Sequence, residues 1–171
     1  MCLQVKWGCR PRIAKSDIVC YKVVEATMSE NRWRSVFRCT EEPYDTPIEA
    51  RNDSAKGFPL IGKLTVCRGT IHAGLHAFVS EDRAVYGMRS WGIGASGLCR
   101  VRRAVIPKGA EYCYGMENDV VANRMIVFGS DEAFSEYVSS SRTVERVGLA
   151  GKIMDKVRDA LPRAVGNKKG K

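Results

Sequence analysis

The chain has 171 residues, of which 44% are hydrophobic and 27% are charged, and its net charge is +9. This length and apolar content fit one domain with a single core, and no apolar run approaches the roughly 20 residues that a membrane-spanning helix needs. The first twelve residues lack the apolar segment of a secretory signal, so we expect a cytoplasmic protein with no membrane contact. Residues 162–171 hold four basic residues and no acid, which predicts a disordered basic tail after one domain over 1–161.

Seven cysteines are spread along the chain, and no two of them form a CxxC pair. Zinc sites need closely spaced ligand pairs, and disulfide frameworks use even counts in secreted chains, so neither is expected. We predict no metal and no cofactor, and we expect most thiols to act as small apolar groups in or near the core. Cys2 differs, because removal of Met1 would leave an N-terminal cysteine whose amine can act as a base. An inert terminus is the alternative.

The N-terminal part of the chain has the sequence features of β-strands. Residues 16–27 are rich in β-branched and aromatic types, and alternation places Ile18, Cys20 and Lys22 on one face of a strand. A polar turn then leads into residues 32–40, which are predicted to be the hairpin partner of that strand.

A long irregular segment follows at residues 41–63, which contain three prolines and two glycines without a sustained period. We expect a loop there, with one short helix around 48–55. A loop of this length in a compact domain is typical of a binding element or lid.

The remaining chain alternates strand signals with helix signals. Ser80 is placed to cap a helix over 81–91, and Ser130 to cap an amphipathic helix over 131–140. A second amphipathic helix is predicted over 141–161, and the two C-terminal helices are expected to form a homo-oligomer contact. Further strands are predicted at 63–71, 75–80, 98–106 and 120–128. Strands first and helices after predict an α+β fold with a mainly antiparallel sheet.

The only two histidines, His72 and His76, are four positions apart. This spacing suits a metal site on a helix, but the flanking residues indicate a turn that enters a strand, where such positions are about 13 Å apart. No metal is therefore expected. His76 is the better candidate for contacting a ligand, beside Phe78 on its own face of the strand.

Other patterns give weaker indications of chemistry. The glycines of WGIGASG, residues 91–97, follow a predicted helix rather than a strand, so a dinucleotide-binding turn is not favoured. Basic residues flank an aromatic residue in RWR, residues 32–34, and they cluster again in RVRR, residues 100–103. Trp33 stacked on a base, with arginines on phosphates, would make a nucleic-acid-binding protein; a solvated basic face is the alternative.

The order of several segments resembles small uncharacterised proteins of phages and prophages. These segments are MCL, DIVCYKVV, GLHAF, VRRAVIPKGAEYCYG and VVANRMIVF, and the likeness covers about residues 1–128. More remotely, the arrangement is similar to the ADP-ribosyltransferase fold. That resemblance implies a first element at Tyr21 and Lys22 and a second at Phe78 and Ser80, with Ala84 on the following helix.

The family's catalytic glutamate has no counterpart, because VVANRM occupies its place and the nearest acids, Glu117 and Asp119, lie upstream. Transferase chemistry needs a carboxylate at the ribose, so the resemblance implies binding without catalysis. We expect a counter-defence protein that sequesters an anionic, nucleotide-derived immune signal. Its ligand contacts are predicted to be Tyr21, Lys22, His76, Phe78, Ser80 and Arg102. An ADP-ribosyltransferase-like or other nucleotide-processing enzyme is the second hypothesis, and nucleic-acid binding the third.

Overall fold

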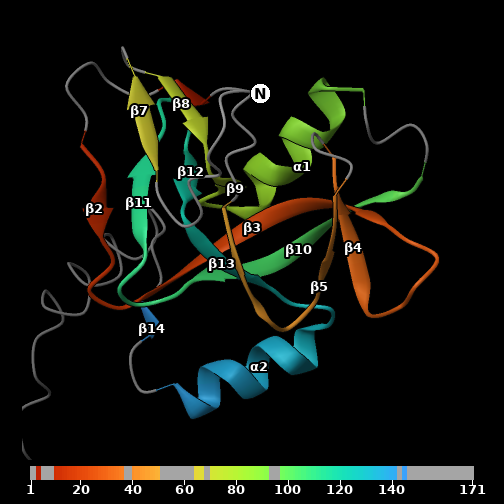
Figure 1. Ribbon diagram of the computed structural model, residues 1–171. Helices are drawn as coiled ribbons and strands as arrows, with labels where there is room; N and C mark the ends of the chain where they lie inside the picture. The colour runs from red at the N-terminus through yellow and green to blue at the C-terminus, as the bar shows by residue number, and fades with distance from the viewer. Residues whose placement is uncertain are drawn as a thin grey trace, which may run out of the picture.

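A computed structural model of the chain describes residues 3–4, 10–36, 40–50, 64–67, 70–92, 97–141 and 144–145. These residues form an α+β fold, with a large and mainly antiparallel sheet, a small three-stranded sheet and two helices (Figure 1). The small sheet has the order β1-β8-β7, with strands Leu3–Gln4, Thr70–Ala73 and Thr65–Cys67.

The large sheet runs in the order β2-β11-β12-β9-β3-β10-β13-β6, and β4, β5 and β14 attach beside this path. Its first half consists of β2 (Arg12–Ile13), β11 (Glu111–Tyr114), β12 (Asp119–Ala122) and β9 (Leu75–Phe78). Its second half consists of β3 (Asp17–Ala26), β10 (Cys99–Ile106), β13 (Arg124–Val127), β6 (Pro47–Glu49), β4 (Arg32–Ser35), β5 (Glu41–Pro43) and β14 (Val144–Glu145). In Figure 1, β11 and β12 run up the page, whereas β3 and β10 cross it below them.

The two halves of the sheet meet along a short seam. Strands β3 and β10 pair over eight residues each, from Ile18 opposite Ile106 to Glu25 opposite Cys99. By contrast, the pairing of β3 with β9 across the seam is the single bridge between Tyr21 and Phe78. Away from this bridge β3 and β9 are not paired, so side chains have to fill the space between the two halves.

The main core lies on the face of β3 that carries Ile18, Cys20 and Val24. It joins both halves of the sheet, because Ala77, Val120 and Ala122 belong to the same cluster. Trp33 is 1% exposed in this core, and its indole N–H donates to the carbonyl of Pro43 at 3.1 Å. Burial of this apolar surface is the main favourable contribution to folding.

Two helices complete the fold. Helix α1 (Glu81–Ser90) packs near β9, β3 and β10, and α2 (Asp131–Ser140) covers a second cluster formed by Val105, Ile126 and Phe128. Each helix begins after a serine whose side-chain oxygen accepts a backbone N–H, as the sequence predicts for Ser80 and Ser130.

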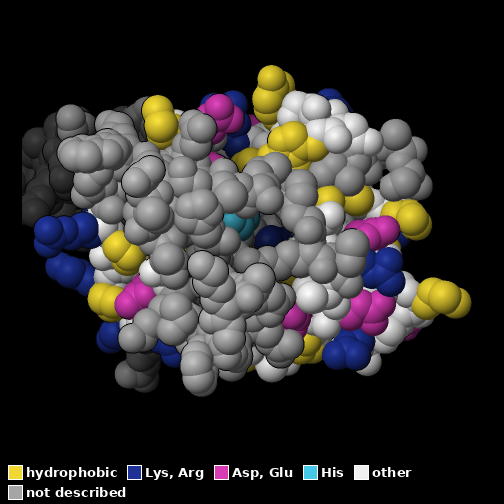
Figure 2. All heavy atoms as spheres, turned by 45° about the horizontal axis from the view of Figure 1, so that its top comes forward, with side chains coloured by type: hydrophobic (Ala, Val, Ile, Leu, Met, Phe, Trp, Pro, Cys, Tyr) yellow, Lys and Arg dark blue, Asp and Glu magenta, His cyan; other side chains and the backbone are white. Residues whose placement is uncertain are grey.

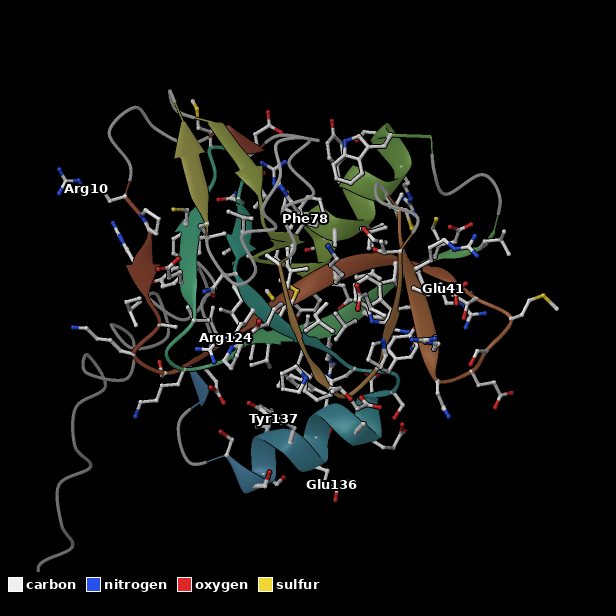
Figure 3. The ribbon with its side chains drawn as sticks, in the orientation of Figure 1. Arg10, Glu41, Phe78, Arg124, Glu136 and Tyr137 are labelled. Atoms are coloured by element: carbon white, nitrogen blue, oxygen red, sulfur yellow. The ribbon has the colours of Figure 1, made fainter. Side chains whose placement is uncertain are left out.

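Buried Asp17 attaches the end of α2 to the sheet. Its carboxylate accepts hydrogen bonds from the Tyr137 hydroxyl and the Ser141 hydroxyl, both at 2.9 Å, and from the backbone N–H of Lys108 at 2.7 Å. In Figure 3, Tyr137 projects from α2 toward the sheet, whereas Glu136 on the same helix points away. This carboxylate therefore has a structural role that the sequence did not reveal.

The strand predictions for 16–27, 75–80 and 98–106 and the helices at 81–91 and 131–140 are confirmed in their main part. Three predictions are wrong. In place of one strand over 63–71 there are two antiparallel strands, β7 and β8. The strand predicted over 120–128 is broken at Asn123 into β12 and β13. The predicted loop over 41–63 begins with two strands, β5 and β6, and β6 lies where the short helix around 48–55 was expected to start.

The C-terminal predictions are tested only at their start. Residues 144–145 form strand β14 beside β3, so the helix over 141–161 does not begin where it was expected. Several predictions fall outside the described residues: the rest of that helix and its expected oligomer contact, the tail at 162–171, the end of the loop at 51–63, Cys2 and Gly94. In the described part of the chain, no helix is both long enough and apolar enough to cross a membrane.

The two histidines belong to different sheets. His72 lies in β8 of the small sheet and His76 in β9 of the large one, with Gly74 between them. Gly74 has φ +156°, and a Cβ there would lie 2.2 Å from Val121 and 2.9 Å from Leu64. A sharp change of strand direction, rather than a turn leading into one strand, therefore separates the pair.

Candidate functional site

A hollow opens beside the seam between β3 and β9, and we call it the Lys22 hollow. It holds about 420 Å³ of empty space, counting the open solvent at its mouth. Its polar and aromatic lining comes from Lys22, Ser35, His76, Phe78, Trp91 and Asp119. Figure 2 shows a histidine and a basic side chain at the floor of a hollow on this side of the molecule.

Lys22 supplies a positive charge at this site. The residue is only 7% exposed, and its ammonium group donates a hydrogen bond to the backbone carbonyl of His76 across the seam. The same nitrogen lies 5.9 Å from the centroid of the Trp33 ring, a distance that allows a cation–π attraction. An ammonium group held at low exposure is weakly screened by solvent, so it attracts an anion more strongly than a surface lysine does.

Phe78 and Trp91 form an aromatic wall on another side of the hollow. Their ring centroids are 5.6 Å apart with an angle of 38° between the ring planes. In Figure 3, Phe78 lies between β9 and α1. Gly87 makes this approach possible, because a Cβ on Gly87 would come within 2.8 Å of the Phe78 ring. The wall offers π faces to a planar ring of a ligand.

Asp119 brings a carboxylate to the hollow. It begins β12 directly opposite Phe78, and burial raises the pKa of its carboxyl group above the usual 3.8. Backbone N–H groups of Asp119 and Glu117 and the charge of Arg83 lower the pKa in part, and the charge of Glu117 raises it. A half-buried carboxyl of this kind can accept hydrogen bonds from ligand hydroxyl groups, or donate one while it is protonated.

The structure brings three of the six predicted ligand contacts together. Lys22, His76 and Phe78 line the Lys22 hollow. Tyr21 and Arg102 line a different hollow, although Arg102 lies directly opposite Lys22 in the register of β3 and β10. The sixth residue, Ser80, caps α1, and its side-chain oxygen accepts the backbone N–H of Arg83 at 3.4 Å.

Trp91 and Asp119 also line the hollow, although they are not among the ligand contacts predicted from the sequence. Asp119 carried a signal, since it is one of the two acids nearest to the place of the family's glutamate. Trp91 carried none beyond its position at the end of a predicted helix, and only the packing of α1 against β9 brings its ring to Phe78.

Two other sequence-based hypotheses can be compared with the geometry. Trp33 is fully buried and is hydrogen-bonded through its indole N–H, so in this structure it cannot stack on a nucleic-acid base. Among the described residues, no group of three or more His, Cys, Asp or Glu side chains is placed to hold a metal ion. The side chain of His72 lies outside the described part of the chain.

The chain was compared with protein-family models, with curated proteins and with solved structures, and none of the three comparisons finds a match. The likeness to the ADP-ribosyltransferase fold therefore stays a prediction from the sequence.

Proposed function

We propose that the protein binds an anionic, nucleotide-derived small molecule, of the ADP-ribose or cyclic nucleotide kind, in the Lys22 hollow. One observation carries the proposal: a buried ammonium group, an aromatic wall and a half-buried carboxyl group line the same hollow. A nucleotide has the three matching parts, which are a phosphate, a planar base and ribose hydroxyls.

Each part of the ligand has a partner of suitable chemistry. Lys22 attracts a phosphate, and a hydrogen-bonded contact between opposite charges contributes about 1.5–3 kcal/mol. The Phe78 and Trp91 rings stack on the base, at about 1–3 kcal/mol for each base. Asp119 accepts ribose hydroxyls. His76 lines the same hollow and can contribute a further polar contact.

We further propose that the ligand is held without chemical change and that the domain is ADP-ribosyltransferase-like. In this proposal the protein acts as a phage-type counter-defence factor, because tight binding lowers the free concentration of an immune nucleotide. The resemblance of several sequence segments to phage proteins is the reason for proposing this role, and the mainly antiparallel α+β architecture is compatible with the fold.

Asp119 favours a second candidate function. A carboxylate beside a bound ribose can stabilise positive charge that develops at the sugar, which is what a nucleotide-processing enzyme of the ADP-ribosyltransferase kind requires. In this alternative the role of the missing glutamate falls to Asp119, which lines the hollow together with Lys22 and His76.

The test is calorimetric titration of the whole protein with ADP-ribose, NAD and cyclic ADP-ribose isomers, followed by heating and chromatography of the released ligand. Saturable binding with the ligand returned intact supports sequestration, whereas an altered nucleotide supports the enzyme. No heat with any of these compounds contradicts both functions.

A substitution at Lys22 tests whether the ligand binds in the Lys22 hollow. Lys22→Gln should weaken binding at least tenfold, which corresponds to about 1.4 kcal/mol, because it removes the charge and retains a polar side chain. The matched control is Arg89→Gln, which removes one positive charge from the exposed last turn of α1 and should change the affinity less than twofold. Equal losses in both variants would show that only net charge matters.

A further inference from the structure

The Lys22 hollow contains a gap in the backbone pairing of the large sheet. On the edge of β3 that faces away from β10, β9 pairs only at the bridge between Tyr21 and Phe78, and β4 pairs only from Val24 onward. Val23 lies between these two contacts, so within the described strands it has no paired residue on that edge. Val23 is nevertheless only 6% exposed, and it lines the hollow.

The direction of the Val23 backbone follows from the register of the strands. In an antiparallel sheet, successive residues alternate between directing their N–H and C=O groups to one neighbouring strand and to the other. The N–H of Ala26 donates to the carbonyl of Leu98 at 2.9 Å, and the register from there to Ile18 is unbroken, so the even-numbered residues of β3 face β10. The odd-numbered residues, Val23 among them, therefore face β9 and β4.

The same rule shows what stands opposite Val23. The N–H of Val79 donates to the carbonyl of Asn118 at 3.0 Å, so the odd-numbered residues of β9 face β12 and the even-numbered ones face β3. Val23 and His76 would therefore form the next hydrogen-bonded rung after the bridge between the two strands. The strands do not pair there, and the His76 carbonyl accepts a hydrogen bond from the Lys22 ammonium group. A regular ladder would direct the Val23 N–H to this same carbonyl, so the two donors converge on one part of the hollow.

Two donors that converge in this way favour an anion. A buried backbone N–H group nearly always has a partner in a folded protein, because leaving it unsatisfied is costly. Backbone N–H groups bind the oxygens of phosphates in many proteins, and a hydrogen bond to a charged oxygen is stronger than one to a neutral oxygen.

The groups of opposite character lie to the sides of this gap. The carbonyl of Val23 lies toward β4, because along the chain it follows the N–H and comes next to Val24, where the pairing with β4 begins. Asp119 is the one acid among the described lining residues, and it belongs to β12, which β9 separates from β3.

We propose that a phosphate group of the ligand occupies the missing rung, where it accepts hydrogen bonds from the Val23 N–H and from the Lys22 ammonium group. This inference rests on the nucleotide binding proposed above, and it assigns the class of ligand. The protein selects nucleotides, held by a phosphate between β3 and β9, over nucleosides or free bases that only the aromatic wall could hold. Val23 contributes through its backbone, so no residue type in the sequence indicates this contact.

The experiment is a titration of the isotope-labelled whole protein with ADP-ribose and, separately, with adenosine, followed by amide NMR. With ADP-ribose, the Val23 amide proton should shift downfield at least about twice as far as that of Val24, whose N–H already faces β10. Adenosine has the base and the ribose but no phosphate, so it should move the Val23 amide no more than that of Val24. A shift of Val23 that is equal with both compounds would place the base in the gap and overturn the proposal.

The outcomes separate this proposal from the function on which it rests. If calorimetry shows that ADP-ribose binds while the Val23 amide moves no more than that of Val24, the phosphate contact is overturned and nucleotide binding stands. If ADP-ribose does not bind, both are overturned.

Two variants test the N–H group directly. Val23→Pro removes this N–H, which the ladder with β10 does not use, whereas Val23→Ala keeps it. The proline variant should bind ADP-ribose about tenfold more weakly than the natural protein, and the alanine variant about twofold or less. Equal affinities of the two folded variants would contradict the assignment. If the proline variant does not fold, the NMR titration of the natural protein decides.

Discussion

Asp119 is the residue at which the two proposed functions differ most. Asp119 lies at the start of β12 and lines the same hollow as Lys22 and two aromatic rings, and burial raises the pKa of its carboxyl group. A neutral carboxyl repels an anionic ligand less than a carboxylate does, so its protonation state affects binding directly.

We predict that binding of ADP-ribose weakens as the pH rises through the pKa of Asp119, which lies above the usual 3.8 because of burial. Below that pKa the group is neutral, and above it the charge repels the phosphates. Asp119→Asn should remove this part of the pH dependence and retain binding, which calorimetry at several pH values can measure. The same variant should abolish any nucleotide conversion, and conversion that survives it would exclude Asp119 as the catalytic carboxylate.

Sequence patterns predict single residues well where local rules decide their position. Alternation placed Cys20 and Lys22 on the same face of the strand over 16–27, and the structure buries both residues in β3. The serine caps also follow from local hydrogen bonding. Asp119 and Trp91 could not be assigned in this way, because their position in the hollow depends on contacts between segments far apart in the chain.

At the scale of elements, α1 contributes to the wall of the Lys22 hollow. Trp91, just after the last turn of this helix, lines the hollow together with Phe78 of β9. The close packing of this helix on β9 depends on Gly87, which has no side chain to separate the helix from Phe78.

Gly87→Ala tests this packing. The added methyl group would come within 2.8 Å of the Phe78 ring, so overpacking of about 1–3 kcal/mol should exceed the gain in helix propensity of about 1 kcal/mol. We expect a net loss of about 1 kcal/mol in chemical unfolding and weaker binding of ADP-ribose, because the ring must move. Arg89→Ala, at an exposed position of the same helix, should change stability by less than about 0.5 kcal/mol. A Gly87→Ala protein with unchanged affinity would show that the aromatic wall does not contact the ligand.

Tyr137→Phe tests the attachment of α2 to β3. The change removes the hydrogen bond to Asp17 and keeps the ring against Phe128, whose centroid is 5.3 Å away. We expect a loss of about 1–2 kcal/mol in unfolding at neutral pH, because the bond is made to a carboxylate. Tyr86→Phe, at a side chain that is 64% exposed, is the matched control and should have no measurable effect.

The same tyrosine predicts a change of stability at high pH. Burial, and then the hydrogen bond and charge of Asp17, raise the pKa of Tyr137 from 10 to about 12. Because the folded state holds this proton more tightly than the unfolded state does, the contribution of Tyr137 is complete below pH 10 and is lost as the pH rises toward about 12. The Tyr137→Phe protein should therefore lose less stability over this range than the natural protein. Equal losses would show that other groups dominate.

The boundaries between elements were harder to predict than the elements themselves. The apolar run over 120–128 gives no sign of its break at Asn123. The side chain of Asn123 accepts the backbone N–H of Glu111 at 2.8 Å, and its carbonyl accepts that of Ala50 at 2.7 Å. These long-range bonds hold a bend that sends β12 into one half of the sheet and β13 into the other.

On the scale of the whole molecule, the important feature is the seam between the two halves of the large sheet. The class of the fold could be predicted from the order of strand and helix signals, but the seam could not. The seam exists because β3 and β9 pair only at Tyr21 and Phe78, whereas eight residue pairs join β3 to β10. The Lys22 hollow opens at this place, and side chains from both halves line it.

A ligand in the Lys22 hollow would contact Lys22 of one half and His76 and Phe78 of the other, so it should strengthen the seam. We predict that saturating ADP-ribose slows amide hydrogen exchange in β9 and in the part of β3 near residues 21–24, with little change in α2. Ligand at 100 times its dissociation constant can contribute up to about 2.7 kcal/mol of protection to an opening that releases it. The Lys22→Gln protein at the same ligand concentration should show a smaller effect. Protection that appears mainly in α2, or none at saturation, would mean that the ligand binds elsewhere and that the seam is not where the molecule holds it.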